Sequence, residues 1–423
     1  MKRTLMTAAG VMALMAGTSS AQELIFPVGE GDFNWASYAE LEKINLDGEQ
    51  VTVFGPWLGP DQALVENVLA YFGAATGADV RYAGSDSFEQ QIVVDAEAGS
   101  APNVAVFPQP GLVSDMAGRG FIAPLGEDTA TWVTDNYAAG QSWVDLGTYS
   151  GPDGNDDLYG LFYKVDVKSL VWFNPENFED FGYEIPSSME ELKTLTDQMV
   201  EDGNTPWCIG LGSGGATGWP ATDWVEDMML RTQEPSVYDQ WVANEIAFDD
   251  PRVVEAIEEF GYFARNEDYV SGGAGAVAST DFRDSPKGLF ASPPQCMMHR
   301  QASFIPAFFP EGTEMGLDAD FFYFPAYEGK ELGNPVLGAG TIWSITNDSD
   351  GARAGDSEAD VTLTADQEIT SGKLHIRALA AIFSGYLSAT DAQSTGLISG
   401  EPAQLRAMNL AFAGPQPWMA EMF

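Results

Sequence analysis

The sequence predicts an α/β fold with a parallel sheet, because short apolar strands alternate with amphipathic helices in its first third. Residues 51–54 (VTVF) read as a short buried strand, and residues 61–72 follow with one apolar helical face. A second strand is predicted at residues 79–82, a second helix at residues 88–97 and a third strand at residues 103–107. This alternation is typical of a sheet with parallel strands and helical connections.

The later sequence predicts a second lobe. From Tyr163 onward apolar and polar residues alternate, as expected for a strand that crosses from one lobe to another. We expect the first lobe to contain residues 22–164, and the chain to return to it at about residues 291–337. The second lobe is expected to combine residues 165–290 with about residues 338–423.

The N-terminus has the layout of a secretory signal peptide at residues 1–21. Lys2 and Arg3 supply the positive end, an apolar run follows, and small residues precede a cleavage site near Ala21. The apolar run is shorter than a bilayer-spanning helix, which needs about 20 residues. We therefore expect export without direct membrane insertion, and a mature chain of 423 − 21 = 402 residues.

Charge excludes some partners. The chain has 63 acidic and 19 basic residues, and its formal net charge is −44. Nucleic acids and anionic membrane surfaces both require a basic face. Neither is expected as a partner.

Two cysteines, Cys208 and Cys296, lie far apart in the sequence. In an exported protein an even cysteine count favours one long-range disulfide, and the alternative is two buried free thiols.

Catalytic and cofactor chemistry has little support. His299 and His375 are the only histidines, no His/Cys/Glu set has metal-ligand spacing, and no Gly-x-Ser-x-Gly motif occurs. Residues 210–215 (GLGSGG) match the Gly-x-Gly-x-x-Gly string, but more glycine and then Pro220 follow. We interpret this segment as a flexible wall of a cleft, and we expect no metal and no cofactor.

Ligand contacts are expected where the strands end. The loops at residues 55–61, 84–88 and 108–111 should converge on one edge of the sheet. They carry aromatic, amide, hydroxyl and acidic side chains, which suit a sugar because its rings present apolar faces and hydroxyl groups. Tryptophans beside later loops are further candidates, each with core packing as the alternative, and Lys164 and Arg300 are candidates with a salt bridge as the alternative. The expected contact residues are Trp57, Asp61, Ser85, Phe88, Gln109, Lys164, Trp172, Trp219, Trp224 and Arg300.

Four motifs resemble the extracellular solute-binding protein family 1. They are GPWLGPD at residues 55–61, AVFPQPG at 105–111, TGWPATDWVED at 217–227 and CMMHRQASF at 296–304. Within this family the sequence is most similar to the alpha-glucoside-binding branch, distant relatives of maltose-binding protein. The resemblance covers roughly residues 23–350.

The resemblance implies a type II-like periplasmic-binding-protein fold, with a ligand cleft between two lobes. It implies a Cys208–Cys296 disulfide, a periplasmic location and no enzymatic activity. The implied function is capture of an alpha-glucoside or other oligosaccharide and its delivery to the permease subunits of an ABC importer in the inner membrane. A secreted hydrolase that uses paired carboxylates, of which Glu258 and Glu259 are one example, is the alternative. After about Arg353 the tail departs from the family pattern, which is compatible with a frame-shifted or truncated C-terminus.

Overall fold

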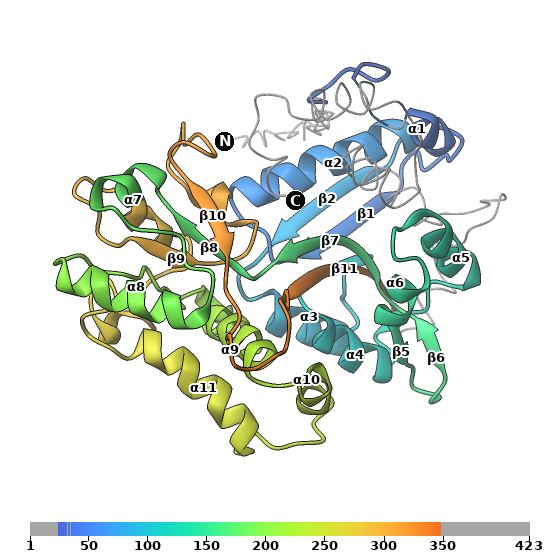
Figure 1. Ribbon diagram of the computed structural model, residues 1–423. Helices are drawn as coiled ribbons and strands as arrows, with labels where there is room; N and C mark the ends of the chain where they lie inside the picture. The colour runs from blue at the N-terminus through green and yellow to red at the C-terminus, as the bar shows by residue number, and fades with distance from the viewer. Residues whose placement is uncertain (1–23, 32, 34, 348–423) are drawn as a thin grey trace, which may run out of the picture.

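The protein has two α/β lobes, seen side by side in Figure 1. The computed structural model describes residues 24–347 except 32 and 34. The expected signal peptide and the atypical tail lie outside the described residues. The chain passes from the first lobe to the second between β7 and β8, and it returns between β10 and β11.

Lobe 1 is built on a six-stranded sheet with the order β2-β1-β3-β11-β4, in which β7 also pairs with β11. The first three strands are parallel, as predicted, and β11 runs antiparallel to β3, β4 and β7. The strands are β1 (Gln50–Gly55), β2 (Asp79–Gly84), β3 (Val104–Phe107), β4 (Ile122–Ala123), β7 (Leu161–Val167) and β11 (Gly338–Thr346). A separate hairpin joins β5 (Thr148–Ser150) and β6 (Asp156–Leu158).

Helices cover both faces of the lobe 1 sheet. Successive side chains of a strand point to opposite faces, so one strand packs against helices on both sides. Val104 and Val106 pack with α2, while Ala105 and Phe107 pack with α3 and α4. Burial on both faces explains why β3, in the interior of the sheet, is entirely apolar, whereas the edge strand β2 carries Asp79 and Arg81. The helices of lobe 1 are α1 (Trp35–Leu41), α2 (Pro60–Thr76), α3 (Phe88–Glu97), α4 (Pro110–Gly118), α5 (Glu127–Asn136) and α6 (Gln141–Leu146).

Lobe 2 has a three-stranded antiparallel sheet with the order β10-β8-β9, from β8 (Leu170–Phe173), β9 (Met298–Arg300) and β10 (Asp320–Tyr323). Its largest core surrounds Trp207, and α8 and α11 lie on the side away from lobe 1 in Figure 1. The helices are α7 (Pro175–Phe181), α8 (Met189–Glu201), α9 (Trp219–Thr232), α10 (Pro235–Val242) and α11 (Pro251–Ala264). Short 3₁₀ turns are η1 (Gly214–Ala216), η2 (Ala274–Ala276), η3 (Ser285–Phe290) and η4 (Ile305–Phe308).

Strand pairing corrects the expected division of the later chain. Residues 291–337 were expected to return to lobe 1, but β9 and β10 within this range pair with β8 of lobe 2. Residues from 338 onward were expected in lobe 2, but β11 pairs with β3 of lobe 1. An apolar strand pattern indicates burial without indicating which sheet the strand joins, so the sequence left this choice undetermined.

The Cys208–Cys296 disulfide is confirmed. The two Cα atoms lie 5.5 Å apart, and both cysteines are buried in a core with Leu170 and Trp172. His299 lies beside the bridge, with Nδ1 2.8 Å from the Cys208 carbonyl oxygen. Burial lowers the pKa of His299 to about 4, so its ring is neutral at pH 7, as a structural residue requires.

Removing the bridge should destabilise the protein. The cysteines are 88 residues apart, and in the loop-entropy model a loop of this length stabilises by about 4–5 kcal/mol. The double variant Cys208→Ser/Cys296→Ser should show this loss in urea unfolding. Dithiothreitol should lower the melting temperature of the wild type and leave that of the double variant unchanged. Two titratable thiols in denatured, unreduced wild type would contradict the bridge.

Candidate functional site

The floor of the interlobe site is the crossing strand β7 and the residues directly after it. Lys164 Nζ lies 3.5 Å from Asp166 Oδ1, and both side chains are largely buried. Two residues further on, Lys168 Nζ lies 2.7 Å from Asp223 Oδ2 of α9. Charged groups therefore line the passage from one lobe to the other, and each is paired because an unpaired buried charge is costly.

Asp61 brings a carboxylate from lobe 1 to this floor. It lies in the first turn of α2, which begins with Pro60. Burial raises its pKa, while Lys164 and, more weakly, Arg283 lower it and Asp166 raises it. Lobe 1, the crossing strand and lobe 2 thus all contribute charges to one electrostatic cluster.

Aromatic rings form the lobe 1 wall. Trp57 is half-buried in the loop between β1 and α2. Its ring stacks beside Tyr82 with centroids 6.2 Å apart, and it meets Tyr163 of β7 edge-on at 5.6 Å. Its backbone N–H donates to the Tyr82 hydroxyl at 2.9 Å. The Trp57 loop crosses so close to Gly84 that a side chain there would clash with the Trp57 carbonyl.

A second aromatic cluster forms the lobe 2 wall. Trp219 begins α9 and packs against Phe282 and Phe304, with ring centroids 5.0 and 5.8 Å away. Lys168 Nζ lies 4.9 Å from the centre of the Trp219 ring, within the range of a cation–π contact. Lys164 Nζ lies 5.8 Å from the Phe304 ring, so the charged floor and this wall are continuous.

A hollow of about 430 Å³ opens between the lobes next to these residues. Leu58, Gly59 and Pro60 line it from lobe 1. Arg283, Asp284, Lys287 and the segment Ala307 to Phe309 line it from lobe 2. Its volume is within the range of small-molecule sites, which is about 300–1,000 Å³.

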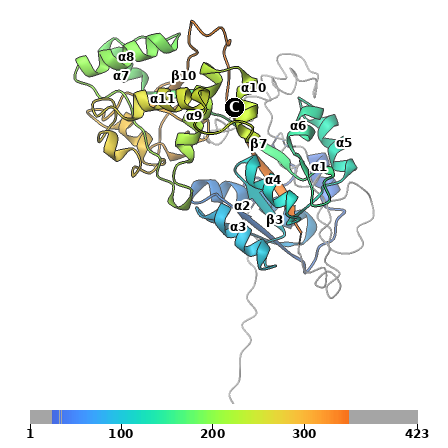
Figure 2. The same cartoon turned by 90° about the horizontal axis from the view of Figure 1, so that it is seen from below.

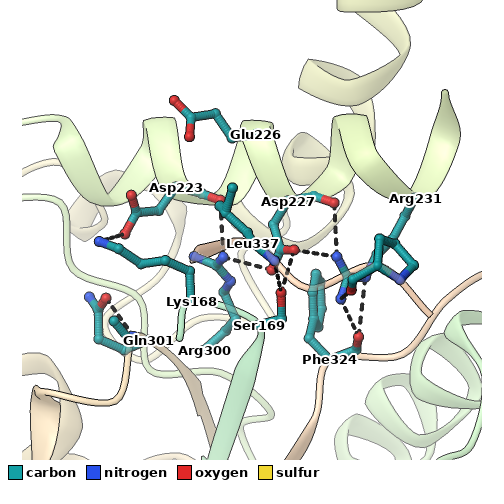
Figure 3. Close-up of polar contacts among 12 residues, drawn as sticks. Lys168, Ser169, Asp223, Glu226, Asp227, Arg231, Arg300, Gln301, Phe324 and Leu337 are labelled. Carbon is teal, nitrogen blue, oxygen red and sulfur yellow. Dashed lines mark hydrogen bonds and ion pairs between the residues drawn. The ribbon is translucent and has the colours of Figure 1, made fainter. Parts of the chain in front are cut away.

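A buried ionic network fixes the lobe 2 side of this site (Figure 3). Asp227 of α9 accepts from Ser169 Oγ at 2.8 Å and from Arg300 Nη2 at 2.7 Å, and it pairs with Arg231. Ser169 Oγ also accepts from the Leu337 N–H at 2.8 Å, and the Lys168 N–H donates to the Leu337 carbonyl at 2.8 Å. The network therefore fastens both crossing segments to one helix.

Glu226 stands apart from this network, as Figure 3 shows. Burial raises its pKa to about 7, and the Asp223 charge adds to the rise. Its side-chain contact is the Tyr238 hydroxyl of α10 at 3.4 Å. Asp223 is held by Lys168, so the two carboxylates have separate partners.

The predicted contact residues separate into two groups. Trp57, Asp61, Lys164 and Trp219 lie around the interlobe floor described above. Ser85 is half-buried in the turn before α3, where its hydroxyl accepts from the Ser87 N–H at 3.1 Å.

The other predicted residues have structural roles, which corrects the expectation for them. Phe88, Trp172 and Trp224 are buried in three different cores. The Gln109 side chain caps α4 through the Gly111 and Leu112 N–H groups and donates to Glu89. Arg300 is buried and pairs with Asp227. Phe88, Trp172 and Trp224 are in cores because apolar residues far apart in the sequence surround their rings.

Five further residues lie at the candidate site but were not predicted, namely Asp166, Lys168, Asp223, Phe304 and Arg283. The sequence does contain a signal for Asp166 and Lys168. With Lys164 they occupy every second position of residues 164–168, and Val occupies the positions between them. Charged residues at every second position place them on one face of the strand. The remaining residues come together only through the fold.

No group of three or more metal-ligating side chains is clustered within the part of the chain that the structure describes. Over the same residues, no helix has the length and apolar character needed to cross a membrane.

Comparison with known proteins gives the family. The profile of the bacterial extracellular solute-binding proteins matches residues 55–283. An alpha-glucosides-binding periplasmic protein of Rhizobium meliloti is 61% identical over 363 residues, which cover 84% of this chain and 79% of the relative. The chain belongs to the bacterial extracellular solute-binding protein family.

Other comparisons agree with the family and with the fold of this solute-binding protein. An osmoprotective compounds-binding protein of Synechocystis sp. is 45% identical over 308 residues, covering 73% of this chain and 71% of the relative. The solved structure of the GacH receptor of Streptomyces glaucescens matches with a TM-score of 0.55 at 16% identity, over 90% of this chain and 86% of the receptor. A second profile, the sterol carrier protein domain, matches residues 332–420, which include β11 and extend beyond the described residues.

Asp61 should make the stability of this solute-binding protein depend on pH. The pKa of Asp61 is raised above 3.8 in the folded state, so the folded state binds more protons than the unfolded state in the window above pH 3.8. Below this window Asp61 is protonated in both states. As the pH rises through the window, the carboxyl ionises more readily in the unfolded state, and the free energy of unfolding falls. Asp61→Asn should therefore raise the melting temperature at about pH 7 and leave it unchanged at about pH 3. The exposed control Asp135→Asn should change neither value, and a lower melting temperature for Asp61→Asn at pH 7 would contradict the expectation.

Asp227→Asn should destabilise lobe 2 strongly. Two buried arginines would lose their shared anion, and breaking a buried ion pair from one side costs about 3–5 kcal/mol. Urea unfolding measures the change. The control is Glu258→Gln, whose pair with Arg265 is exposed and should contribute little. Equal stability of the two variants would show that Asp227 does not anchor the lobe.

Proposed function

We propose that this protein is the substrate-binding component of an ABC importer, and that it captures an alpha-glucoside or another oligosaccharide by lobe closure. The observation that carries the proposal is the 61% identity to an alpha-glucosides-binding periplasmic protein, over most of both chains. A site between two lobes, with aromatic walls and a charged floor, supports the same conclusion.

The residues around the floor suit a neutral sugar. Trp57 and Trp219 offer broad apolar surfaces on opposite lobes, against which sugar ring faces can pack. Asp61, Lys164 and Asp166 offer acceptors and donors for hydroxyl groups, and hydrogen bonds to charged groups are the stronger ones. A ligand that contacts both walls favours the closed arrangement, because only that arrangement provides all of its contacts.

The location and the partners follow from the same proposal. Residues 1–21 would direct export and be removed near Ala21, which leaves the mature protein in the periplasm. There the closed protein would deliver its sugar to the permease subunits of the importer. We propose no catalytic role, since the relatives are binding proteins by name.

A binding screen tests this proposal and the hydrolase alternative together. Thermal-shift measurements against maltose, trehalose and sucrose should show a raised melting temperature for at least one sugar, because a ligand that binds the native state stabilises it. Isothermal titration calorimetry gives the affinity. The sugar should be recovered intact after prolonged incubation. Released glucose would support the hydrolase, and the absence of any shift across a broad sugar panel would contradict sugar binding.

Two tryptophans of the same helix should respond oppositely to truncation. Trp219→Ala should weaken sugar binding about tenfold or more, because a stacked ring contributes roughly 1–3 kcal/mol of apolar contact. Trp224→Ala should lower the free energy of unfolding by about 3–5 kcal/mol, because the ring is buried among Trp207, Phe263 and Phe324. Calorimetric titration and urea unfolding of both variants separate the two effects. Normal affinity with reduced stability in Trp219→Ala would place this ring in the core instead.

The lobe 1 wall has its own variant. Trp57→Ala should also weaken sugar binding by roughly tenfold, because its ring lies at the β1–α2 loop beside Tyr163. Trp132→Ala provides a control, since Trp132 is a half-buried tryptophan of α5 that packs on Tyr137. The control should keep normal affinity. A stronger loss of affinity in the control than in Trp57→Ala would contradict the placement of the site.

A further inference from the structure

The glycine-rich segment of lobe 2 makes a direct contact with lobe 1. Gln90 Nε2 of α3 donates to the Gly215 carbonyl at 3.0 Å. The loop that precedes α9 reaches down to the lobe 1 helices in Figure 2. We propose that Gly214 and Gly215 form a latch with Asp86, Ser87 and Gln90, and that this latch holds the two lobes together and slows release of the ligand.

The latch depends on the absence of side chains. A Cβ added at Gly215 would lie 2.6 Å from Ser87 Oγ and 3.2 Å from both Ser87 Cβ and Gln90 Oε1. A Cβ added at Gly214 would collide with the Asp86 carboxylate, and Gly214 also has a φ of +53°, which favours glycine. The backbone of lobe 2 therefore rests directly on the β2–α3 turn of lobe 1. This contact explains why two glycines are needed at these positions. A cofactor-binding motif would not explain them.

The lobe 2 side of the latch is firmly attached to its own lobe. The Gly212 N–H donates to the Thr280 carbonyl at 2.8 Å, and the Phe282 N–H donates to the Gly212 carbonyl at 2.9 Å. Thr217 Oγ1 donates to the Gly214 carbonyl at 2.8 Å and accepts from the Ser213 N–H at 3.0 Å. Trp219 starts α9 directly after this loop, so the latch and one wall of the site belong to the same short segment.

The latch is separate from the connections that the crossing strands make. Those connections are held by Lys168, Ser169 and Leu337, whereas the latch joins the η1 turn to the N-terminal end of α3. Two separate attachments oppose opening more than either alone, since the lobes must break the latch before they can rotate about the crossing strands. The consequence for ligand release rests on the function proposed above, while the contact itself does not.

The steric test uses a matched pair of glycines. Gly215 is the exposed middle residue of η1, and Gly275 is the exposed middle residue of η2, where an added Cβ would meet nothing within 4 Å. Gly215→Val should give a larger radius of gyration in small-angle scattering without ligand, because the side chain holds the lobes apart. Gly275→Val makes the same change in the backbone preference of a 3₁₀ turn, and its radius of gyration should match that of the wild type. Equal radii for the two variants would overturn the latch.

The hydrogen-bond test uses neighbouring glutamines. Gln90→Ala should speed sugar release by about two- to tenfold in stopped-flow measurements, which is the effect of one net hydrogen bond, and leave the association rate nearly unchanged. Gln91 is exposed on the same helix, and Gln91→Ala should match the wild type. Equal release rates for the two variants would overturn the proposal. If the wild type binds no sugar, the proposed function fails, and the scattering comparison still decides whether the latch exists.

Discussion

The structure depends on the buried carboxylate of Asp227. It is fully buried and receives hydrogen bonds from Ser169, Arg231 and Arg300, which lie in segments far apart in the sequence. A buried charge is tolerated only when its lone pairs are occupied in this way. Because Ser169 also holds Leu337, the same group fixes both segments that connect the lobes. Arg231 extends the attachment to the carbonyls of Phe324 and Pro325.

The arrangement of the cleft follows from this attachment. With the crossing segments held on α9, Lys168 meets Asp223 and the face of Trp219, and β7 carries Lys164 and Asp166 past the end of α2. Asp61 then completes a cluster to which both lobes contribute. Its desolvation is unfavourable for folding, and a perturbed carboxyl between two lobes is the kind of group that supports the site proposed above.

The prediction was accurate where the signal is local. The three parallel strands of lobe 1 and their helices follow from short-range periodicity, and the disulfide followed from the cysteine count and the family resemblance. At the candidate site, the structure brings three of the predicted residues together: Trp57 on the loop after β1, Asp61 in the first turn of α2 and Lys164 on the crossing strand. Trp219 and Trp224 show the limit of this approach. They are five positions apart in one motif, yet one ring lies beside Lys168 and the other is enclosed by Trp207, Phe260 and Phe324.

By itself the sequence determined the α/β class, the first strand–helix units, the acidic surface charge and the family motifs, because each depends on composition or on neighbours within a few turns. Only the tertiary structure decided that β9 and β10 join lobe 2 while β11 returns to lobe 1. It also decided that Arg300 pairs with Asp227 and that the Gly214-Gly215 backbone touches α3. These outcomes depend on which distant segments meet. A periodic pattern of apolar residues indicates that a side chain is buried, but it does not indicate which segment the side chain packs against.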